Sequence, residues 1–372
     1  MSIRILHAID HLGYGGAPFV VKGIVERMPA DRVESIVCAL RPNPRPLPIA
    51  VETITLQGRK YSLAAVGALA RLCRDRRIDI LHAHLQKAIL SSLLAAPRTA
   101  SRLVLHEHGP IFRGGTGCLY RGLLRRLGRR ADAVLANSEA AKSAVQRALR
   151  DPAVPVADVP NFIDTARFDP GRYDRDGIRA SLGVGPDEFV IGFVGRLDRA
   201  KGADLLVEAA AALHRPGDSR RFLIVGDGPE RGRLQDRIRT LGLEGTVVLA
   251  GLHENPAAIM RAFDAGVVPS RREAFGIAAL EMMRMRVPVI VSPAGGLPEL
   301  VQDGRTGIVL AQLCPEAIAQ AVQRLEQDAA LRQTLARNAC ERAGAFDGRE
   351  QIEQILAIYE RLAVNPRRIR GT

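Results

Sequence analysis

Two carboxylates and the expected start of a helix stand close together in the second half of the sequence. Glu273 and Glu281 are eight positions apart, and Gly276 lies where an apolar helical pattern beginning with Ile277 should start. The first backbone N–H groups of a helix have no partner within it, so those around Phe275, Gly276 and Ile277 favour an anion such as a phosphate. Two carboxylates flanking a phosphate cradle suit a ligand with hydroxyls at both ends and a diphosphate in the middle. A nucleotide-sugar is such a ligand.

A glycine-rich turn near the N-terminus indicates a second loop that contacts phosphate. It follows an apolar run, Ile3 to Ile9, that should form a buried strand, and it precedes a helix expected over Phe19 to Met28. Gly15 and Gly16 leave no Cβ in the way of a ligand. The turn does not match the G-x-G-x-x-G fingerprint of dinucleotide-binding proteins, so it is weak evidence on its own.

Two histidine pairs occur where buried strands should end, which is the usual place for ligand sites in a parallel sheet. They are His82 with His84 and His106 with His108. We interpret the spacing of two residues as directing the two rings of each pair to opposite faces of the sheet. No cysteine or acidic cluster completes a ligand set, so we expect no metal site.

The elements that must position these residues alternate along the whole chain. Apolar runs that read as short buried strands are each followed by a loop and a helical pattern, and in the second half these loops contain glycine. This alternation predicts an α/β protein with doubly wound parallel sheets, whose ligand loops gather at the carboxyl ends of the strands. A chain of 372 residues is long enough for two such domains.

Charge is shared unevenly between the two halves. Residues 1–165 contain 24 Lys and Arg against 13 Asp and Glu, whereas the remaining residues contain 29 against 27. The excess points to an anionic partner on the first half. Tryptophan is absent and aromatic residues make up 4% of the chain, so the stacking platforms of nucleic-acid-binding proteins are scarce. We therefore expect no nucleic acid partner.

One segment of the first half, Leu119–Arg130, has leucines at helical spacing and five arginines. Either its leucines face the core and its charged face is solvated, or the helix lies on an anionic membrane surface. The N-terminus is too brief for a secretory signal, and no apolar run approaches the length of a spanning helix. We expect a cytoplasmic protein, with peripheral attachment to the inner face of the membrane as the alternative to a free one.

These motifs, in this order, resemble those of the GT-B-fold retaining glycosyltransferases of family GT4 (glycosyl transferases group 1). The matching pieces are spread over nearly the whole chain and include the glycine turn, His82-Ala-His84, His108 after a strand, Gly195-Arg-Leu-Asp-Arg-Ala-Lys-Gly202, Gly226-Asp-Gly-Pro229, Glu273-x7-Glu281 and Gly295-Gly-Leu-Pro-Glu299. The resemblance implies a GT-B fold, in which two Rossmann-like domains face a central cleft. It implies an acceptor-binding domain at 1–165, a donor-binding domain at 166–345, and a C-terminal helix with a basic tail at 346–372 that packs back toward the first domain.

The resemblance also implies roles for individual residues. Arg196 and Lys201 would hold the donor diphosphate, Glu281 the ribose hydroxyls and Glu273 the hydroxyls of the transferred sugar, while His108 would face that sugar from the other domain. The implied catalytic residues are His108, Glu273, Arg196 and Lys201. The implied donor-binding residues are Gly15, Gly16, Arg196, Lys201, Gly228, Glu273, Phe275, Gly276, Ile277 and Glu281.

The main expectation is therefore a retaining hexosyltransferase that needs no metal or other cofactor, because two cations and a helix terminus can neutralise the leaving diphosphate. Its donor would be a nucleotide-diphosphate sugar, most simply a UDP-sugar. Its acceptor would be a glycan or a lipid-linked glycan of the cell envelope, held on the basic first domain. Two alternatives remain: a UDP-sugar epimerase or hydrolase on the same plan, and a non-enzymatic nucleotide-binding module.

Overall fold

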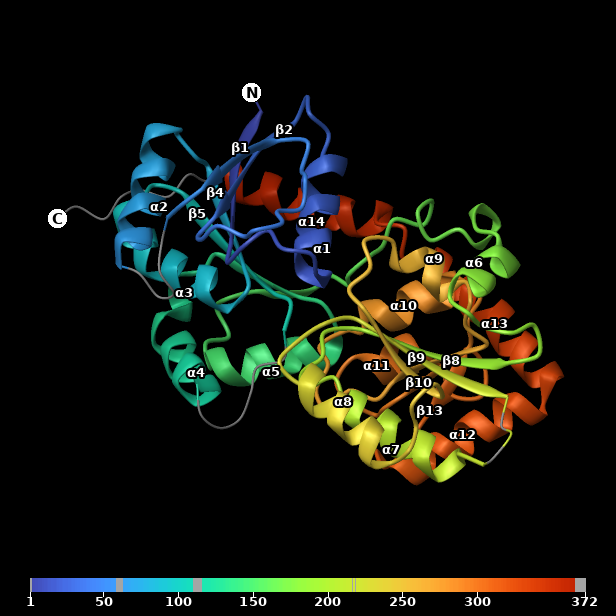
Figure 1. Cartoon of the computed structure of the whole chain (residues 1–372). Helices are drawn as coiled ribbons and strands as arrows, with labels where there is room; N and C mark the ends of the chain where they lie inside the picture. Colours follow the sequence, from blue (N-terminus) through green and yellow to red (C-terminus); the bar gives the residue numbers. More distant parts are fainter. Residues whose placement is uncertain (1, 58–62, 110–115, 216, 218, 365–372) are drawn as a thin grey trace. The chain divides into compact units, whose positions relative to one another are not determined.

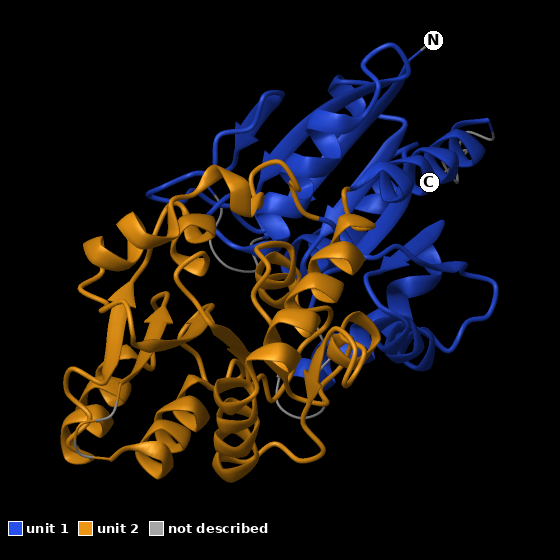
Figure 2. Ribbon diagram, turned by 90° about the vertical axis from the view of Figure 1, so that its right-hand side faces the viewer, with its two compact units in different colours: residues 1–162, 348–372 blue, residues 163–347 orange. Residues whose placement is uncertain are grey.

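A computed structural model describes residues 2–57, 63–109, 116–215, 217 and 219–364. The chain forms two compact units, which Figure 2 shows in different colours. Unit 1 comprises residues 1–162 and 348–372, and unit 2 comprises residues 163–347. The basic tail expected at 365–372 lies outside the described residues.

Unit 1 is built on a seven-stranded sheet in which every strand pairs parallel to its neighbours, in the order β3-β2-β1-β4-β5-β6-β7. The inner strands β4 and β5 are buried almost throughout, as expected for strands covered by helices on both faces. The strands are β1 (Ile3–Ile9), β2 (Val33–Ala39), β3 (Glu52–Thr55), β4 (Ile80–His84), β5 (Arg102–Glu107), β6 (Ala133–Ala136) and β7 (Val156–Asp158).

Helices cover both faces of this sheet (Figure 1). Residues of α2, α3, α4 and α5 share one core with the strands, whereas α1 packs with alternate residues of β1 and β2, and α14 contacts β1 and β4. The helices are α1 (Gly16–Arg27), α2 (Leu63–Asp75), α3 (Gln86–Ala95), α4 (Thr116–Leu127), α5 (Glu139–Leu149) and α14 (Arg349–Ala363), with short 3-10 turns η1 (Ala96–Arg98) and η2 (Gly128–Arg130).

Unit 2 repeats the plan with a six-stranded parallel sheet in the order β10-β9-β8-β11-β12-β13. Its strands are β8 (Phe189–Val194), β9 (Arg220–Val225), β10 (Val247–Gly251), β11 (Ala265–Val268), β12 (Val289–Val291) and β13 (Gly307–Val309). The order runs outward in both directions from β8 and β11, so crossovers pass on both sides of the sheet. The predicted α/β class with doubly wound parallel sheets is therefore confirmed.

Two cores sandwich the sheet of unit 2. Residues of α7, α8 and α12 share one core with β8 and β9, and residues of α9, α10, α11 and α13 share the other. The helices are α6 (Arg175–Ser181), α7 (Ala203–Leu213), α8 (Arg231–Thr240), α9 (Pro256–Met260), α10 (Ile277–Arg284), α11 (Leu297–Leu300), α12 (Pro315–Gln327) and α13 (Ala329–Gly344), with the 3-10 turn η3 (Pro170–Arg172).

Two helix starts can be compared closely with the sequence. Ser138, a residue type preferred as N-cap, starts α5, and its hydroxyl accepts a hydrogen bond from the Ala141 N–H at 3.1 Å. Helix α1 begins at Gly16 rather than at Phe19. Pro18 is the third residue of that helix, a place where its missing N–H costs nothing because the first turn has no internal acceptors. The glycine turn therefore forms the start of the helix itself.

Candidate active site

The centre of the candidate site in unit 2 is an ion pair between two residues that the sequence singled out. Lys201 Nζ lies 2.7 Å from Glu273 Oε2. The Ser270 hydroxyl donates a second hydrogen bond to the same carboxylate oxygen at 3.1 Å. Glu273 is mostly buried and Lys201 about one-third exposed. A fixed carboxylate next to a lysine that is reachable from solvent can bind a ligand with both hydroxyl and phosphate groups.

Contacts between two loops hold this pair in place. The loop after β8 carries Lys201, and the loop after β11 carries Glu273. The Arg271 backbone N–H donates to the Ala200 carbonyl at 2.8 Å. The Arg271 guanidinium donates to both oxygens of Asp204, at 2.6 and 2.7 Å. Such a two-pronged ion pair fixes orientation as well as distance, so the two loops act as one support.

Arg196 lies on the same loop and is the more exposed of the two predicted phosphate-binding cations, with 71% of its side chain accessible. Its Nε donates to Asp198 Oδ2 at 2.7 Å. The other oxygen of Asp198 accepts the backbone N–H groups of Ala200 and Lys201, at 3.0 and 3.2 Å. Asp198 thus shapes the loop that carries both cations. Sequence reasoning missed it, although it follows Arg196 by two positions in the matched motif.

Glycines of the predicted ligand loops lie where the backbone of one loop touches that of another. A Cβ at Gly228 would lie 2.4 Å from the Leu197 carbonyl oxygen, and one at Gly295 would lie 1.7 Å from the carbonyl oxygen of Glu273. Gly295 also has a φ of +56°, in the left-handed region that favours glycine. The glycines therefore bring the loops together at the carboxyl ends of the strands.

The start of α10 has the features that the sequence predicted. Gly276 adopts a φ of +104° as the N-cap, and the helix begins at Ile277 without a side-chain cap. Its first N–H groups are consequently available to an anion. The Phe275 side chain is buried and packs against Phe346, so this residue offers its backbone rather than its ring to a ligand.

Glu281 lies one turn inside α10. Burial raises the pKa of its carboxyl group to about 8, and the nearby positive charge of Arg167 acts in the opposite direction. At neutral pH this carboxyl is therefore largely protonated in the free protein. Sequence reasoning missed Arg167, which lies at the start of the expected donor-binding domain and carries no motif of its own.

The remaining predicted residues, Gly15, Gly16 and His108, belong to unit 1. Gly15 is the N-cap of α1, which starts without a side-chain cap, and the binding of phosphate by Gly15 and Gly16 stays a prediction. His108 follows β5 and is partly exposed.

His108 belongs to a group of five histidines on one face of the unit 1 sheet. The prediction that the two rings of each pair point to opposite faces is wrong, because side chains two positions apart on a strand share a face. The ring centroids of His82 and His84 are 4.1 Å apart, and those of His106 and His108 are 4.0 Å apart. His7, the register partner of His82 on β1, completes the group. We call these five residues the histidine cluster.

Burial leaves the histidine cluster neutral at pH 7. It lowers the pKa of His7 to about 3 and that of His108 to about 4, where the Asn161 side chain acts in the opposite direction. It lowers the pKa values of the other three rings, those of His82, His84 and His106, well below the usual range. The cluster is also tied to the C-terminal helix, since the Tyr359 hydroxyl of α14 lies 2.6 Å from His82 Nδ1.

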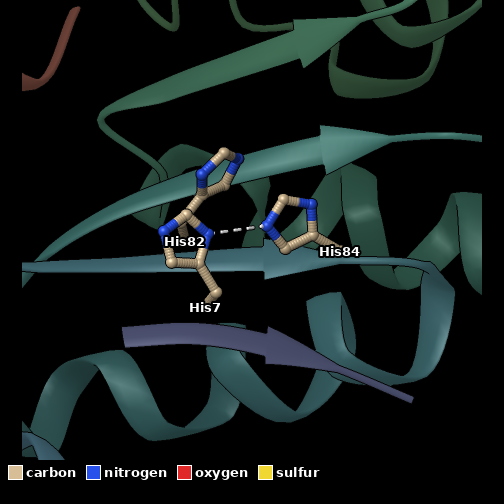
Figure 3. A group of neighbouring side chains, drawn as sticks. All are labelled: His7, His82 and His84. Carbon is tan, nitrogen blue, oxygen red and sulfur yellow. Dashed lines mark hydrogen bonds between the residues drawn. The ribbon is translucent and has the colours of Figure 1, made fainter. Parts of the chain in front are cut away.

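Parts of the histidine cluster could bind a metal ion. Ring nitrogens of His7, His82 and His84, drawn in Figure 3, lie within 4.8 Å of one another, as do those of His84, His106 and His108. Neutral imidazole suits zinc, nickel and copper. Both groups consist of imidazoles alone, without the carboxylate that would suit magnesium or manganese. That the reaction needs no metal stays a prediction.

Two family models together span most of the chain. "Glycosyltransferase Family 4" matches residues 14–167, and "Glycosyl transferases group 1" matches residues 174–342. The first match covers unit 1 from the glycine turn to β7, without β1 and α14, and the second covers all six strands of unit 2.

Curated relatives agree with these families. An alpha-D-kanosaminyltransferase of Streptomyces kanamyceticus is 31% identical over 289 residues, which cover 76% of this chain and 74% of the relative. A D-inositol 3-phosphate glycosyltransferase of Actinosynnema mirum is 35% identical over 240 residues, which cover 62% of this chain. The chain spans 57% of the length of that second relative.

Solved structures resemble the chain over nearly its full length. HepE of Anabaena, crystallised with UDP and glucose, has a TM-score of 0.83 and 25% identity and covers 96% of this chain and 99% of its own. A sucrose-phosphate synthase of Thermosynechococcus elongatus has a TM-score of 0.85 and 22% identity, and the match covers 97% of this chain and 99% of the synthase chain. The second likeness concerns the fold alone.

Proposed function

The chain belongs to the family 4 glycosyltransferases and has their GT-B fold, and on that premise we propose that it transfers a hexose from a UDP-sugar with retention of configuration. The observation that carries the donor assignment is the Lys201–Glu273 pair supported by the joined loops of unit 2. HepE, which resembles this chain, was crystallised with UDP. A UDP-sugar is therefore the donor we favour.

We assign the leaving diphosphate to Arg196, Lys201 and the start of α10. An ammonium group has three N–H donors, so Lys201 can keep its bond to Glu273 and still donate to a phosphate oxygen. Arg196 contributes a planar fork, and the uncapped N–H groups at Phe275, Gly276 and Ile277 add partial positive charge. Together they stabilise the charge that develops as the bond from sugar to phosphate breaks. No metal is needed for this neutralisation.

We propose a front-face displacement for the transfer itself. As the glycosidic bond to phosphate breaks, the acceptor oxygen bonds to the same face of the sugar carbon, and the acceptor proton passes to the departing phosphate oxygen. Glu273 accepts hydrogen bonds from hydroxyls of the transferred sugar, Glu281 accepts them from the ribose, and His108 donates one to the sugar. Interactions that strengthen as the diphosphate gains charge lower the barrier.

A panel of UDP-, GDP- and ADP-sugars in a thermal-shift assay tests the donor class. A ligand at a concentration a hundredfold above its Kd stabilises a folded protein by about 2.7 kcal/mol, so the matching donor should raise Tm. We expect the UDP-sugars to raise it and Lys201→Ala to abolish the rise. Arg199→Ala is the matched control, since Arg199 lies on the same loop and its side chain is exposed. The assignment is contradicted if a UDP-sugar still raises Tm in Lys201→Ala. It is also contradicted if no nucleotide-sugar raises Tm in the unaltered protein.

We further propose that the acceptor is a lipid-linked or envelope glycan and that unit 1 binds an anionic membrane surface through α4 and α5. A cavity of about 370 Å³ lies along these helices and is lined by Arg121, Arg125, Arg147 and Arg150, without any carboxylate in its lining. Leu119 beside it is 66% exposed. Positive charge next to an apolar side chain suits phospholipid headgroups. Within the described residues, no helix has both the length and the apolar character needed to cross a bilayer.

Co-sedimentation with vesicles tests the membrane proposal. We expect the protein to sediment with vesicles that contain phosphatidylglycerol and to sediment little with vesicles of phosphatidylcholine alone. The double variant Arg121→Gln/Arg147→Gln should not sediment with either. Removing the same charge from α2, with Arg71→Gln/Arg74→Gln, serves as the control. Equal recovery with both kinds of vesicle would end the proposal.

A further inference from the structure

Three members of the histidine cluster, His7, His82 and His84, have the chemistry of a transition-metal site. His7 and His82 are register partners on the neighbouring strands β1 and β4, and His84 lies two positions further along β4 on the same face. One ring nitrogen of each lies within 4.8 Å of those of the other two (Figure 3). We call these residues the three-histidine group.

The spacing within this group suits a metal ion. His7 Nδ1 lies 3.2 Å from His84 Nε2, the contact drawn as a dashed line in Figure 3. Two nitrogens bound to zinc at roughly 2.0–2.1 Å stand about 3.3 Å apart when the angle between them is tetrahedral. Burial lowers the pKa of all three rings, so they are neutral at pH 7 and can offer a lone pair without first losing a proton.

Two of these rings also have the outer contacts that metal-bound histidines usually have. His82 Nδ1 lies 2.6 Å from the Tyr359 hydroxyl, and His84 Nδ1 lies 3.0 Å from His108 Nε2. A ligating imidazole commonly donates its second N–H to a partner of this kind, which fixes the orientation of the ring. The Nε2 atoms of His82 and His84 are thereby left for an ion.

Burial gives the reason why an ion is favoured at this place. The three rings have no accessible surface, and His82 Nε2 has no hydrogen-bond partner among the described residues. A buried polar atom without a partner is costly, so in a folded protein such an atom points to an ion or a water bound beside it. Coordination of a metal would use the lone pair of this nitrogen.

The other set of neighbouring rings, His84, His106 and His108, is a poorer site. Within the part of the chain that the structure describes, neither nitrogen of His106 has a hydrogen-bond partner, so no outer contact orients that ring. The function proposed above also assigns His108 to the sugar. The three-histidine group is therefore the better of the two candidates.

We propose that His7, His82 and His84 bind a divalent transition-metal ion, zinc in the first place, with a buried water as the fourth ligand. The expectation of no metal site relied on rings that point to opposite faces, which is wrong, and three imidazoles hold zinc in carbonic anhydrase without cysteine or carboxylate. The ion joins β1 to β4 and, through the contact with Tyr359, ties the sheet to α14. It takes no part in sugar transfer, so this inference does not depend on the proposed function.

Metal analysis of the full-length protein, purified without a histidine tag, tests the site. Because the rings are buried, the protein is refolded with zinc and then passed through gel filtration with a weak chelator. We expect about one zinc ion per chain in the unaltered protein and none in His7→Gln or His84→Gln. His106→Gln is the matched control and should keep its zinc, because it removes a buried imidazole of the histidine cluster that lies outside the three-histidine group.

The proposal is overturned if the unaltered protein retains no zinc, cobalt, nickel or copper. It is equally overturned if zinc stays in His7→Gln or His84→Gln, or if His106→Gln loses it. X-ray absorption at the zinc edge of the unaltered protein decides the matter if these variants do not fold. It should show imidazole nitrogens at about 2.0–2.1 Å, and sulfur ligands would refute the site.

A variant of the outer contact gives a separate readout. Tyr359→Phe removes the hydroxyl that holds His82 Nδ1 and keeps the buried ring. Loss of such an outer partner weakens metal binding roughly 10- to 100-fold, and we expect a change of that size in the Kd for zinc, measured by competition with a chromophoric chelator. An unchanged Kd would remove His82 from the ligand set and would overturn the proposal.

Discussion

Glu281 faces two conflicting demands. Its position inside the buried start of α10 raises the pKa of the carboxyl group to about 8, so the uncharged form predominates at neutral pH. The role proposed for it, however, is to accept hydrogen bonds from two ribose hydroxyls, which a carboxylate does better than a carboxylic acid. Binding of the donor should therefore remove a proton from Glu281.

Donor affinity should consequently rise with pH. Below a pKa of about 8 the free protein must lose a proton before it offers a carboxylate, so Kd for a UDP-sugar should fall by up to about tenfold per pH unit between pH 6 and 8, and level off above. The diphosphate of a UDP-sugar is fully ionised in this range. Titration calorimetry at several pH values measures this. Glu281→Gln should bind more weakly and lose the dependence. A Kd independent of pH in the unaltered protein would contradict the role of Glu281.

At the scale of elements, the site depends on loops that touch backbone to backbone. The loops after β8, β9, β11 and β12 each bring a glycine, a carbonyl or a backbone N–H against a neighbouring loop. Because these contacts involve main-chain atoms, a side-chain rotation cannot relieve a clash there. Ligand geometry in unit 2 is thus set by the packing of loops as much as by the charged residues they carry.

Two glycines with similar backbones separate this effect from simple strain. Gly295 and Gly304 have φ values of +56° and +67°, but an added Cβ would meet the Glu273 carbonyl at Gly295 and open space at Gly304. Alanine at either position should cost about 1–2 kcal/mol for the left-handed backbone. At Gly295 the clash should also displace the loop of Glu273, which should lower the free energy of unfolding by a further amount of about 1–3 kcal/mol and weaken donor binding. Denaturant unfolding and donor Kd check this. Equal donor binding in both variants would count against loop packing as the cause.

The sequence predicts elements well here because their signals are local. The strand predicted over Ile3 to Ile9 has the bounds of β1, and the Gly276–Ile277 start of α10 was predicted to the residue. Contacts between residues far apart in the sequence leave no local pattern that would predict them. Nothing in the order of residues pairs Arg271 with Asp204, or His82 with Tyr359 at a separation of 277 positions.

The error about the histidine pairs has a different origin. The strand period of two residues was available from the sequence and, applied correctly, places His82 with His84 and His106 with His108 on one face. What the sequence could not supply is the parallel register that sets His7 beside His82 and His84 beside His106. The histidine cluster is therefore a product of strand pairing and not of either motif alone.

At the scale of the whole molecule, the two units should respond differently to acid. All five rings of the histidine cluster lie in unit 1 and have lowered pKa values. In the unfolded chain each ring titrates near its usual value of about 6.5. The unfolded state therefore binds more protons below that pH, and the stability contributed by these neutral rings falls as pH decreases. Below pH 6.5, each ring lowers the free energy of unfolding by up to about 1.4 kcal/mol for each unit by which the pH falls.

Unit 1 should accordingly open first on acidification. One group opposes the trend, because burial raises the pKa of Glu107 to about 7, but five rings outweigh one carboxyl. Hydrogen exchange corrected for intrinsic rates should show β1, β4 and β5 losing protection between pH 7 and 5 while the sheet of unit 2 keeps it. His106→Phe, which removes one ring, should shift the loss to lower pH. Simultaneous opening of both units would refute the assignment to the histidine cluster.

Unit 1 is made of two pieces of chain, and the helix that supplies Tyr359 to His82 is encoded after the whole of unit 2. During synthesis the ribosome delivers the seven strands first, then all of the contiguous second unit, and only at the end the segment that covers the histidine face. The part made second can thus finish folding before the part made first. Termination of synthesis before α14 would leave the sheet of unit 1 without this helix, although unit 2 would be complete.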